Sequence, residues 1–373
     1  MDKHLHIVAL DVPLPADYGG VIDIFYKIKA LHQLGVKIHL HCFAKGRKQQ
    51  EELNKYCASV NYYKRKKNSS SFSLILPLIV KSRRSAELIA NLKKDNYPVL
   101  LEGIHCTYYL HTGELSNRKI LVRLHNTEFE YYKQLAKNER NILKKIYFLT
   151  ESRLLYQYEK SISNKAIFLA MSQKDATAYT TILDAKNTHY LPVFISNTMA
   201  VGKDGKGCYC LYHGNLAINE NETAVIWLLH NVFNDIEIPF VIAGKDPSKK
   251  LQQLAHQYKH TCLVANPGEK EMQDMIAKAQ VHVLPSFNNT GIKLKLINAL
   301  FNGRHCLVNA AGVNGSGLEN VCHIATDAVS FKKVITELYQ RPFTGQEKEQ
   351  RQGFLQNLYN NEENAKQLIT FLW

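Results

Sequence analysis

The chain has 373 residues, enough for two domains at roughly 150 residues per domain. Its composition, 45% hydrophobic and 21% charged, excludes a disordered protein, and no apolar run reaches the roughly 18 to 20 residues that a membrane-spanning helix needs. The net charge of +14 is uneven, because residues 1–200 hold 30 basic and 17 acidic side chains and residues 201–373 hold 17 and 16. We therefore expect the N-terminal half to meet an anionic partner.

The cysteines and histidines indicate neither a disulfide framework nor a metal site. Cys208 and Cys210 are the only close cysteine pair of eight, and they alternate along a predicted strand, so we predict reduced core thiols. The 16 histidines lack metal-ligand spacing. The first residues lead directly into an apolar strand pattern without a signal-peptide core, which predicts a cytoplasmic protein.

The first half of the chain alternates strand and helix patterns. The predicted elements are strands at 5–10, 36–43, 98–104, 119–125 and 166–172, and helices at 21–35 and about 127–161. Such a series predicts a parallel sheet covered by helices on both faces.

After a glycine-rich charged segment at 201–207, which is typical of an interdomain linker, the alternation restarts. The predicted elements are strands at 208–214, 239–244, 261–266, 281–284 and 304–309, and helices at about 219–232, 248–258, 269–279 and from 292. We therefore predict an α/β protein with two doubly wound, Rossmann-like domains, 1–200 and 201–345. A helical tail, 346–373, is expected to cross back to the N-terminal domain.

Ligands of doubly wound sheets bind beyond the carboxyl ends of the strands. After the first predicted strand, Gly19 and Gly20 immediately precede a helix, where a ligand can approach the backbone N–H groups at the positive end of the helix dipole. A plain strand-to-helix turn is an equally good interpretation of this pair, and the lack of a GxGxxG pattern argues against a dinucleotide cofactor.

A second strand end, at 119–125, is followed by polar side chains. Arg123, His125, Asn126 and Glu128 crowd the start of the next helix, where burying them without partners would cost several kcal/mol. We prefer a functional role to a satisfied structural network.

The third strand end lies after residue 284, where a polar loop leads to Gly291 and a helix whose first turns contain Lys293 and Lys295. A basic residue at a helix N-terminus opposes the dipole unless an anion is bound. The pair therefore favours a bound diphosphate over an ordinary solvated helix start.

Three segments carry a resemblance to a known family: HGNLAINENETAVIWLL (213–229), FVIAGKDP (240–247) and, most specifically, PSFNNTGIKLKLINALFNGRHCLVN (285–309). With the tandem architecture and the Gly-Gly loop, the chain resembles the retaining GT-B glycosyltransferases of the family-4, or group 1, type in bacterial polysaccharide biosynthesis. The resemblance implies two domains facing a cleft, with a UDP- or GDP-sugar donor held mainly by the C-terminal domain and the acceptor by the N-terminal one.

The resemblance also implies the reaction: transfer of a hexose to a glycan or lipid-linked glycan, with retention of configuration, in surface polysaccharide assembly. It implies no cofactor and no metal, because lysines and helix N-termini carry the diphosphate charge. Residue by residue, it implies His125 and Lys293 as catalytic residues and Arg123, Asn126 and Glu128 on the acceptor side. The implied donor-binding residues are Gly19, Gly20, Gly214, Asn215, Lys245, Thr290, Gly291, Ile292, Lys295 and Asn298.

Some positions depart from the family pattern. The two glutamates usual in the third segment are Thr290 and Asn298 here, and the usual Arg and Lys after the first strand of the second domain are Asn215 and Glu220. Lysines 293, 295 and 245 would then supply the positive charge.

The departures leave open a second hypothesis, a catalytically silent GT-B-like subunit that docks on membranes or scaffolds a partner enzyme. A sugar hydrolase is a distant third, with Glu102, Glu128 and Glu130 as its only candidate carboxylates.

The segment 62–94 concentrates the basic excess. Nine basic residues and one acid flank the apolar stretch FSLILPLIV at 72–80, a composition typical of an interfacial anchor. We predict peripheral binding to the anionic inner face of the cytoplasmic membrane through residues 64–94, with a solvated loop and a buried apolar strand as the alternative. The run YYKRKK mixes aromatic and basic residues, but without a nucleic-acid-binding motif we predict no nucleic-acid partner.

Overall fold

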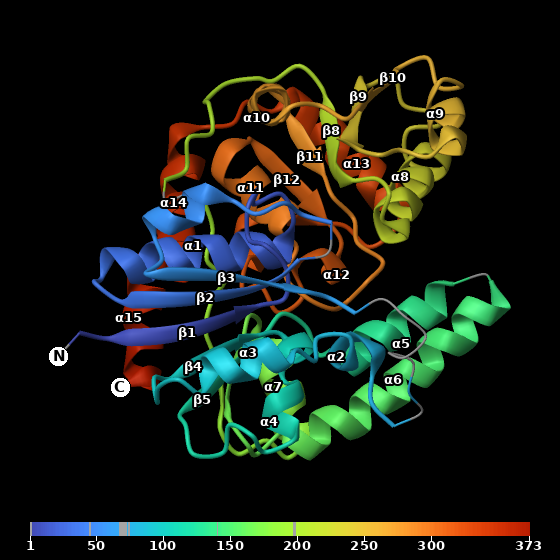
Figure 1. The fold of residues 1–373 in the computed structure, drawn as a ribbon. Helices are drawn as coiled ribbons and strands as arrows, with labels where there is room; N and C mark the ends of the chain where they lie inside the picture. Colours follow the sequence, from blue (N-terminus) through green and yellow to red (C-terminus); the bar gives the residue numbers. More distant parts are fainter. Residues whose placement is uncertain (1, 45, 67–72, 74, 140, 197–198) are drawn as a thin grey trace. The chain divides into compact units, whose positions relative to one another are not determined.

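The computed structural model describes residues 2–44, 46–66, 73, 75–139, 141–196 and 199–373. The chain forms two compact units. Unit 1 comprises Met1–Ser196 and Tyr359–Trp373, and unit 2 comprises Asn197–Leu358. Each unit is built around one parallel sheet with helices (Figure 1), as expected for an α/β protein of two doubly wound domains.

The sheet of unit 1 has seven parallel strands in the order β3-β2-β1-β4-β5-β6-β7. Their bounds are β1 His4–Ala9, β2 Lys37–Ala44, β3 Ser59–Lys64, β4 Val99–Glu102, β5 Ile120–Leu124, β6 Ile167–Ala170 and β7 Thr188–Tyr190. The sequence predicts five of these strands and misses the two at the edges. β3 contains no fully apolar run, and β7 is only three residues long.

The helices of unit 1 follow the strands in alternation. They are α1 Gly19–Gln33, α2 Leu78–Lys81, α3 Ala86–Leu92, α4 Tyr108–His111, α5 Glu128–Asn138, α6 Ile142–Ile162, α7 Gln173–Ile182 and α15 Asn361–Leu372, with short 3-10 turns η1 Glu51–Lys55 and η3 Ile104–Cys106. The single helix predicted over about 127–161 is wrong. It is two helices, because the side chain of Asn141 caps a new helix by accepting a hydrogen bond from the backbone N–H of Lys144 (3.1 Å).

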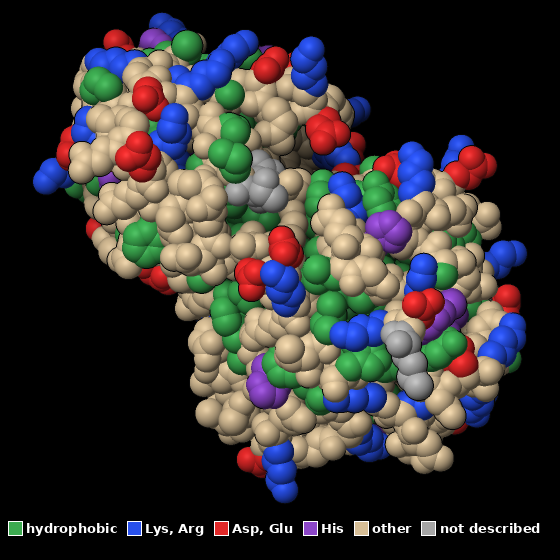
Figure 2. Space-filling view, turned by 90° about the vertical axis from the view of Figure 1, so that its left-hand side faces the viewer, with side chains coloured by type: hydrophobic (Ala, Val, Ile, Leu, Met, Phe, Trp, Pro, Cys, Tyr) green, Lys and Arg blue, Asp and Glu red, His purple; other side chains and the backbone are tan. Residues whose placement is uncertain are grey.

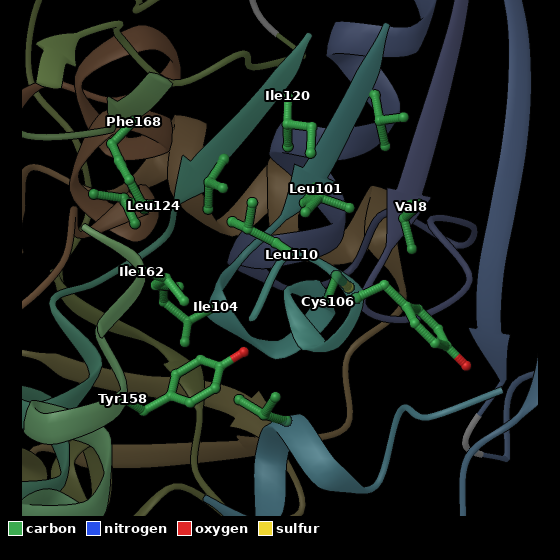
Figure 3. Close-up of a cluster of buried hydrophobic side chains, with 14 of the residues drawn as sticks. Val8, Leu101, Ile104, Cys106, Leu110, Ile120, Leu124, Tyr158, Ile162 and Phe168 are labelled. Atoms are coloured by element: carbon green, nitrogen blue, oxygen red, sulfur yellow. The ribbon is translucent and has the colours of Figure 1, made fainter. Parts of the chain in front are cut away.

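Two apolar cores cover the two faces of this sheet. Successive strand residues alternate between them, so that Val8 and Leu101 belong to one core and Ile7 and Leu100 to the other. The C-terminal half of α6 supplies Tyr158 and Ile162 to the first core (Figure 3), and α15 supplies Ala365, Leu368 and Leu372 to the second. Two covered faces explain why the strands read as continuous apolar runs.

Part of the apolar stretch predicted as a membrane anchor lies in the core. Residues 67–72 and 74 lie outside the described residues, but Ile79 and Val80 in α2 are buried in the first core. Arg83 is also buried and donates hydrogen bonds to the carbonyl oxygens of Leu10 and Ile79. In the described part of 72–80, Ile75 is the large apolar side chain left exposed, at 82%. The prediction that this stretch forms an interfacial anchor is therefore wrong for its described C-terminal part.

The sheet of unit 2 has six parallel strands in the order β10-β9-β8-β11-β12-β13. The strands are β8 Cys210–Asn215, β9 Phe240–Lys245, β10 Thr261–Ala265, β11 Val281–Val283, β12 His305–Val308 and β13 His323–Ile324. The helices are α8 Asn219–Asn231, α9 Lys249–Ala255, α10 Glu269–Lys278, α11 Leu294–Asn302, α12 Ala310–Val313, α13 Ala328–Gln340 and α14 Gly345–Leu358, with the turn η4 Glu319–Val321.

Both sheets reverse their strand order beside their first strand. The reversal lies between β1 and β4 in unit 1 and between β8 and β11 in unit 2. Loops leaving neighbouring strands diverge at such a point and leave a crevice at the carboxyl edge, where doubly wound folds bind ligands. The residues that end these strands therefore define the candidate site of each unit.

The unit boundary at 196/197 lies close to the one predicted at residue 200. The predicted tail 346–373 behaves as two pieces, since α14 belongs to unit 2 and only α15 belongs to unit 1. Among the helices of the described chain, none combines the length and the apolar character needed to cross a bilayer.

Candidate functional site

In unit 1, His125 directly follows β5, the strand next to β4, and has glycine on two sides. A Cβ atom added to Gly20 would lie 3.6 Å from Nδ1 of His125, and one added to Gly103 would lie 3.7 Å from its Cδ2. Gly103 has φ +74, a conformation that favours glycine. The structure thus brings together the predicted residues Gly20 and His125, and backbone lies close to the imidazole on both sides.

His125 is oriented by a buried carboxylate. Its Nε2 lies 3.0 Å from Oε2 of Glu102, the last residue of β4, and the two side chains are 9% and 0% exposed. Burial alone would raise the pKa of Glu102, but the ammonium of Lys27 and the hydrogen bond from His125 hold that pKa below its usual value. Glu102 is therefore an anion that fixes the ring, and not the exposed acid that a hydrolase would need.

A charge network continues from Glu102 into the core. The Nζ of Lys27 lies 2.8 Å from Oε1 of Glu102 and 2.7 Å from Oδ2 of Asp23, and Asp23 in turn binds the guanidinium of Arg123 at 2.9 and 3.1 Å. All four side chains are fully buried. Despite its burial, Asp23 has a lowered pKa because Arg123 and Lys27 stabilise its charge.

This network corrects one prediction. The remaining donors of Arg123 bind the carbonyl oxygens of Leu191 (2.6 Å) and Pro192 (2.9 Å), and its side chain has no exposed surface. Arg123 therefore ties the end of the sheet to the segment after β7 and cannot contact an acceptor. The acceptor-side prediction for Arg123 is wrong because its buried partner, Asp23, lies 100 positions away in the sequence.

In the described part of the chain, one cluster has metal-ligand spacing: Asp23, Glu102 and His125, whose ligand atoms lie within 4.8 Å of one another. The ammonium of Lys27 already lies between the two carboxylates. A divalent cation here would have to displace a buried Lys27 whose charge both carboxylates need, so these residues do not fit a metal site.

The other two predicted acceptor-side residues differ in exposure. Asn126 is partly exposed, whereas Glu128, in the first turn of α5, is 3% exposed. Burial raises the pKa of Glu128 to about 7, with the hydrogen bond from Asn126 opposing the rise and the charge of Asp175 adding to it. Of the three side chains assigned to the acceptor side, Asn126 is the one at the surface.

In unit 2, the backbones of β8 and β9 lie very close together at the ends of these parallel strands. Gly214 pairs with Gly244, and Asn215 with Lys245. A Cβ atom added to Gly244 would lie 1.9 Å from the carbonyl oxygen of Gly214, so any side chain there would force the strands apart. Lys245 is exposed at the same edge. The predicted residues Gly214, Asn215 and Lys245 therefore do share one strand edge.

Lys295 lies beside Gly214, where β8 and β9 are closely paired. Its Nζ donates to the hydroxyl of Tyr212 (2.8 Å) and to Oδ1 of Asn221 (2.7 Å), and its Cδ would contact a Cβ on Gly214 at 3.7 Å. The ammonium also lies over the Tyr212 ring, 4.6 Å from its centroid. Burial lowers the pKa of Lys295 to about 7, against the raising effect of Glu220 and with the help of Lys293.

Lys293 is held differently. Its Nζ lies 3.3 Å from Oε1 of Glu220 and donates to the carbonyl oxygen of Thr290 (2.9 Å). The carboxylate of Glu220 also accepts hydrogen bonds from Ser286 Oγ (2.8 Å) and Asn288 Nδ2 (3.1 Å). Three donors of the loop after β11 thus converge on an acidic side chain of α8.

The start of α11 also differs from the prediction. The helix begins at Leu294 with Lys293 as its N-cap residue, and Gly291 (φ +66) and Ile292 belong to the preceding loop. Thr290 is 5% exposed and its hydroxyl donates to Oδ1 of Asn288 (2.7 Å), so this side chain is held inside the loop. Asn298 is partly exposed on α11 and accepts from Nδ2 of Asn302 (2.6 Å).

Sequence reasoning missed several residues of these two constellations: Asp23, Lys27, Tyr212, Asn221, Ser286 and Asn288. One signal was present. Asp23 and Lys27 are four residues apart on the face of α1 that also carries Ile24 and Ile28, and a charged pair among apolar residues indicates a buried partner.

Comparisons with known proteins agree with this architecture. Residues 207–341 match the family model described as "Glycosyl transferases group 1". A protein of Klebsiella pneumoniae described as "Uncharacterized 44.6 kDa protein in cps region" is 28% identical over 363 residues, and the match covers 91% of each chain.

Solved structures show the same fold. Sucrose-phosphate synthase from Thermosynechococcus elongatus superposes with a TM-score of 0.72 at 14% identity, over 99% of this chain and 98% of that one. HepE from Anabaena, solved with UDP and glucose, gives 0.66 at 12% identity over 99% of both chains.

The doubly wound units and these likenesses define the class: this is an α/β protein with the GT-B fold. Within that class, residues 207–341, which lie in unit 2, are similar to the group 1 glycosyltransferases.

Proposed function

We propose that the protein is a retaining glycosyltransferase that moves a hexose from a nucleoside diphosphate sugar to a glycan or lipid-linked glycan in surface polysaccharide assembly. One observation carries the proposal: Lys295 lies beside the closely paired glycines at the ends of β8 and β9, and Lys293 lies near Glu220 at the start of α11, so backbone and cations can meet a diphosphate at this edge. The relative from a cps region and the UDP in the HepE structure support it.

In this proposal, unit 2 holds the donor and unit 1 the acceptor, and His125, fixed by Glu102, contacts the donor sugar. The reaction proceeds by front-face displacement, in which the departing phosphate helps to deprotonate the acceptor. Catalysis then comes from orientation and from lysine charge next to the developing phosphate charge. We infer that the lysines perform the role that a divalent cation has in other transferases.

We further propose that the protein acts in the cytoplasm, peripherally on the inner face of the membrane, with a lipid-linked acceptor. The basic residues of the segment 64–94 that remain exposed, such as Arg84 and Lys94, supply the attraction to anionic lipid.

The test is release of UDP or GDP from a panel of nucleotide sugars, with and without membrane lipid extract as the acceptor source. The proposal predicts turnover with one donor and a product of retained anomeric configuration. If no donor in the panel binds or turns over, the proposal fails.

A second candidate is a catalytically silent GT-B subunit that scaffolds a partner enzyme. The observation in its favour is the carboxylate of Glu220, which already receives the donors of Ser286, Asn288 and Lys293. Lys293→Ala with Lys295→Ala distinguishes the two: unchanged cellular function in that variant supports the scaffold, and loss of function supports the enzyme.

A further inference from the structure

The exposed apolar side chains of unit 1 gather on one helical hairpin. More than half of the large ones among the described residues lie on α6. They are Ile142 (73% exposed), Leu143 (79%), Ile146 (56%), Leu149 (42%) and Tyr156 (36%). Figure 1 shows α5 and the N-terminal half of α6 extending beyond the sheet of unit 1, while the C-terminal half of α6 packs on it. A contiguous exposed apolar surface on a folded domain marks an interaction site.

The spacing of these residues places them on one face. Ile142, Ile146 and Leu149 follow an i, i+4, i+7 pattern, which is one stripe of a helix. The opposite face of α6 packs against the rest of unit 1 through buried residues such as Leu155 and Ile162. The hairpin is closed by Tyr132 of α5 against Phe148 of α6, with ring centroids 6.0 Å apart. The exposed stripe lies on the side of α6 away from these contacts.

Basic side chains surround the stripe. Lys133 and Lys137 of α5 and Lys144 and Lys145 of α6 are exposed. Residues 133–153 contain six basic and two acidic side chains, and one of the acids, Glu151, is 3% exposed and accepts a hydrogen bond from the backbone N–H of Leu78 (3.0 Å). That contact brings the segment with exposed Ile75 against α6.

We propose that Ile142, Leu143, Ile146 and Leu149, here called the hairpin tip, insert into the headgroup region of an anionic membrane while the neighbouring lysines bind lipid phosphate. Apolar residues interleaved with lysines on a helix are the composition of an interfacial helix. A second copy of the chain fits less well, because the same lysines would face one another. The inference rests on the proposed membrane-side acceptor, and it moves the apolar contact from α2, whose Ile79 and Val80 are buried, to α6.

The first test is co-sedimentation with vesicles of phosphatidylglycerol and phosphatidylethanolamine, compared with phosphatidylcholine alone. The double variant Ile142→Glu, Leu143→Glu is expected to bind the anionic vesicles at least about tenfold more weakly than the wild type. The matched control is Val329→Glu, which changes an equally exposed side chain (77%) on α13 of unit 2 and is expected to leave binding unchanged.

The second test reports insertion directly. Leu143→Trp is expected to show a blue-shifted emission with the anionic vesicles and quenching by lipids brominated in the acyl chains. Val329→Trp provides the control, since it adds a tryptophan at a site that the proposal leaves in water.

Vesicle binding is measured without a sugar donor, and nucleotide release is measured without vesicles. A failure of the membrane-binding proposal can therefore be distinguished from a failure of the proposed enzyme activity. The inference is overturned if the glutamate variant binds vesicles as the wild type does, or if Leu143→Trp stays unshifted. It is also overturned if the glutamate variant dissociates a dimer that the wild type forms in solution.

Discussion

Lys293 and Lys295 are two residues apart, yet their ammonium groups have different partners. Lys293 binds the carboxylate of Glu220, and Lys295 binds the neutral groups of Tyr212 and Asn221. The sequence predicts both as cations beside a ligand, which agrees with their place at the carboxyl edge of the sheet. It does not predict their environments, because those depend on residues more than 70 positions away.

The lowered pKa of Lys295 makes donor binding depend on pH. With a pKa of about 7, the amine is mainly charged below pH 7 and loses its charge as the pH rises. A sugar-esterified diphosphate does not titrate in this range, so its affinity is expected to fall by up to about tenfold per unit above pH 7. Calorimetric titration with a nucleotide sugar at pH 6, 7 and 8 measures this slope.

Lys295→Arg is the control for that prediction, because a guanidinium stays charged throughout this range. The variant is expected to bind the donor with little dependence on pH. An identical slope in wild type and variant would show that Lys295 is not the titrating group.

Asp23 holds the buried network of unit 1 together. Asp23→Asn would leave Arg123 and Lys27 buried with only Glu102 as a counter-charge, at a cost of about 3 to 5 kcal/mol of unfolding free energy. Chemical denaturation monitored by circular dichroism checks this value.

An exposed ion pair provides the comparison for Asp23. Glu362→Gln, which breaks a pair with Lys366 at the surface, is expected to change the denaturation midpoint very little. Equal effects of the two substitutions would mean that the buried network does not stabilise the fold.

At the scale of elements, the regular alternation of apolar strands and amphipathic helices is predictable from local pattern, and most boundaries agree within a few residues. The errors have local physical causes. The break between α5 and α6 depends on one capping residue, Asn141, within a continuous helical pattern. The start of α11 is displaced because the backbone of Lys293 (φ −88, ψ 85) is not helical, so the helix begins only at Leu294.

The two C-terminal helices belong to different units. Leu355 of α14 and Leu368 of α15 are both fully buried, the first in unit 2 and the second in unit 1. Leu368→Ala is expected to lower the stability of unit 1 by about 2 to 5 kcal/mol, and Leu355→Ala that of unit 2 by a similar amount. Hydrogen exchange followed by mass spectrometry locates each loss.

The opposite pattern of exchange would contradict the assignment of α15 to unit 1. If Leu368→Ala increased exchange in the strands of unit 2 and left β1 and β2 protected, α15 would not belong to the core of unit 1.

At the scale of the whole molecule, the charge of +14 is not gathered into one patch on the face drawn in Figure 2. On that face, lysines and arginines alternate with acidic and apolar side chains. Part of the basic excess of the N-terminal half is also internal, since Lys27, Arg83 and Arg123 are buried. Composition alone could not predict this, because it does not distinguish a cation that folds the domain from one that meets a partner.

The central claim is that unit 2 binds a nucleoside diphosphate through Lys293 and Lys295. Isothermal titration of UDP and GDP into the wild type and into the variant Lys293→Ala, Lys295→Ala tests it most directly. The account predicts that the wild type binds one of the two nucleotides and that the variant, with an unchanged unfolding temperature, does not. Equal affinity in both proteins, or no binding by the wild type, would contradict it.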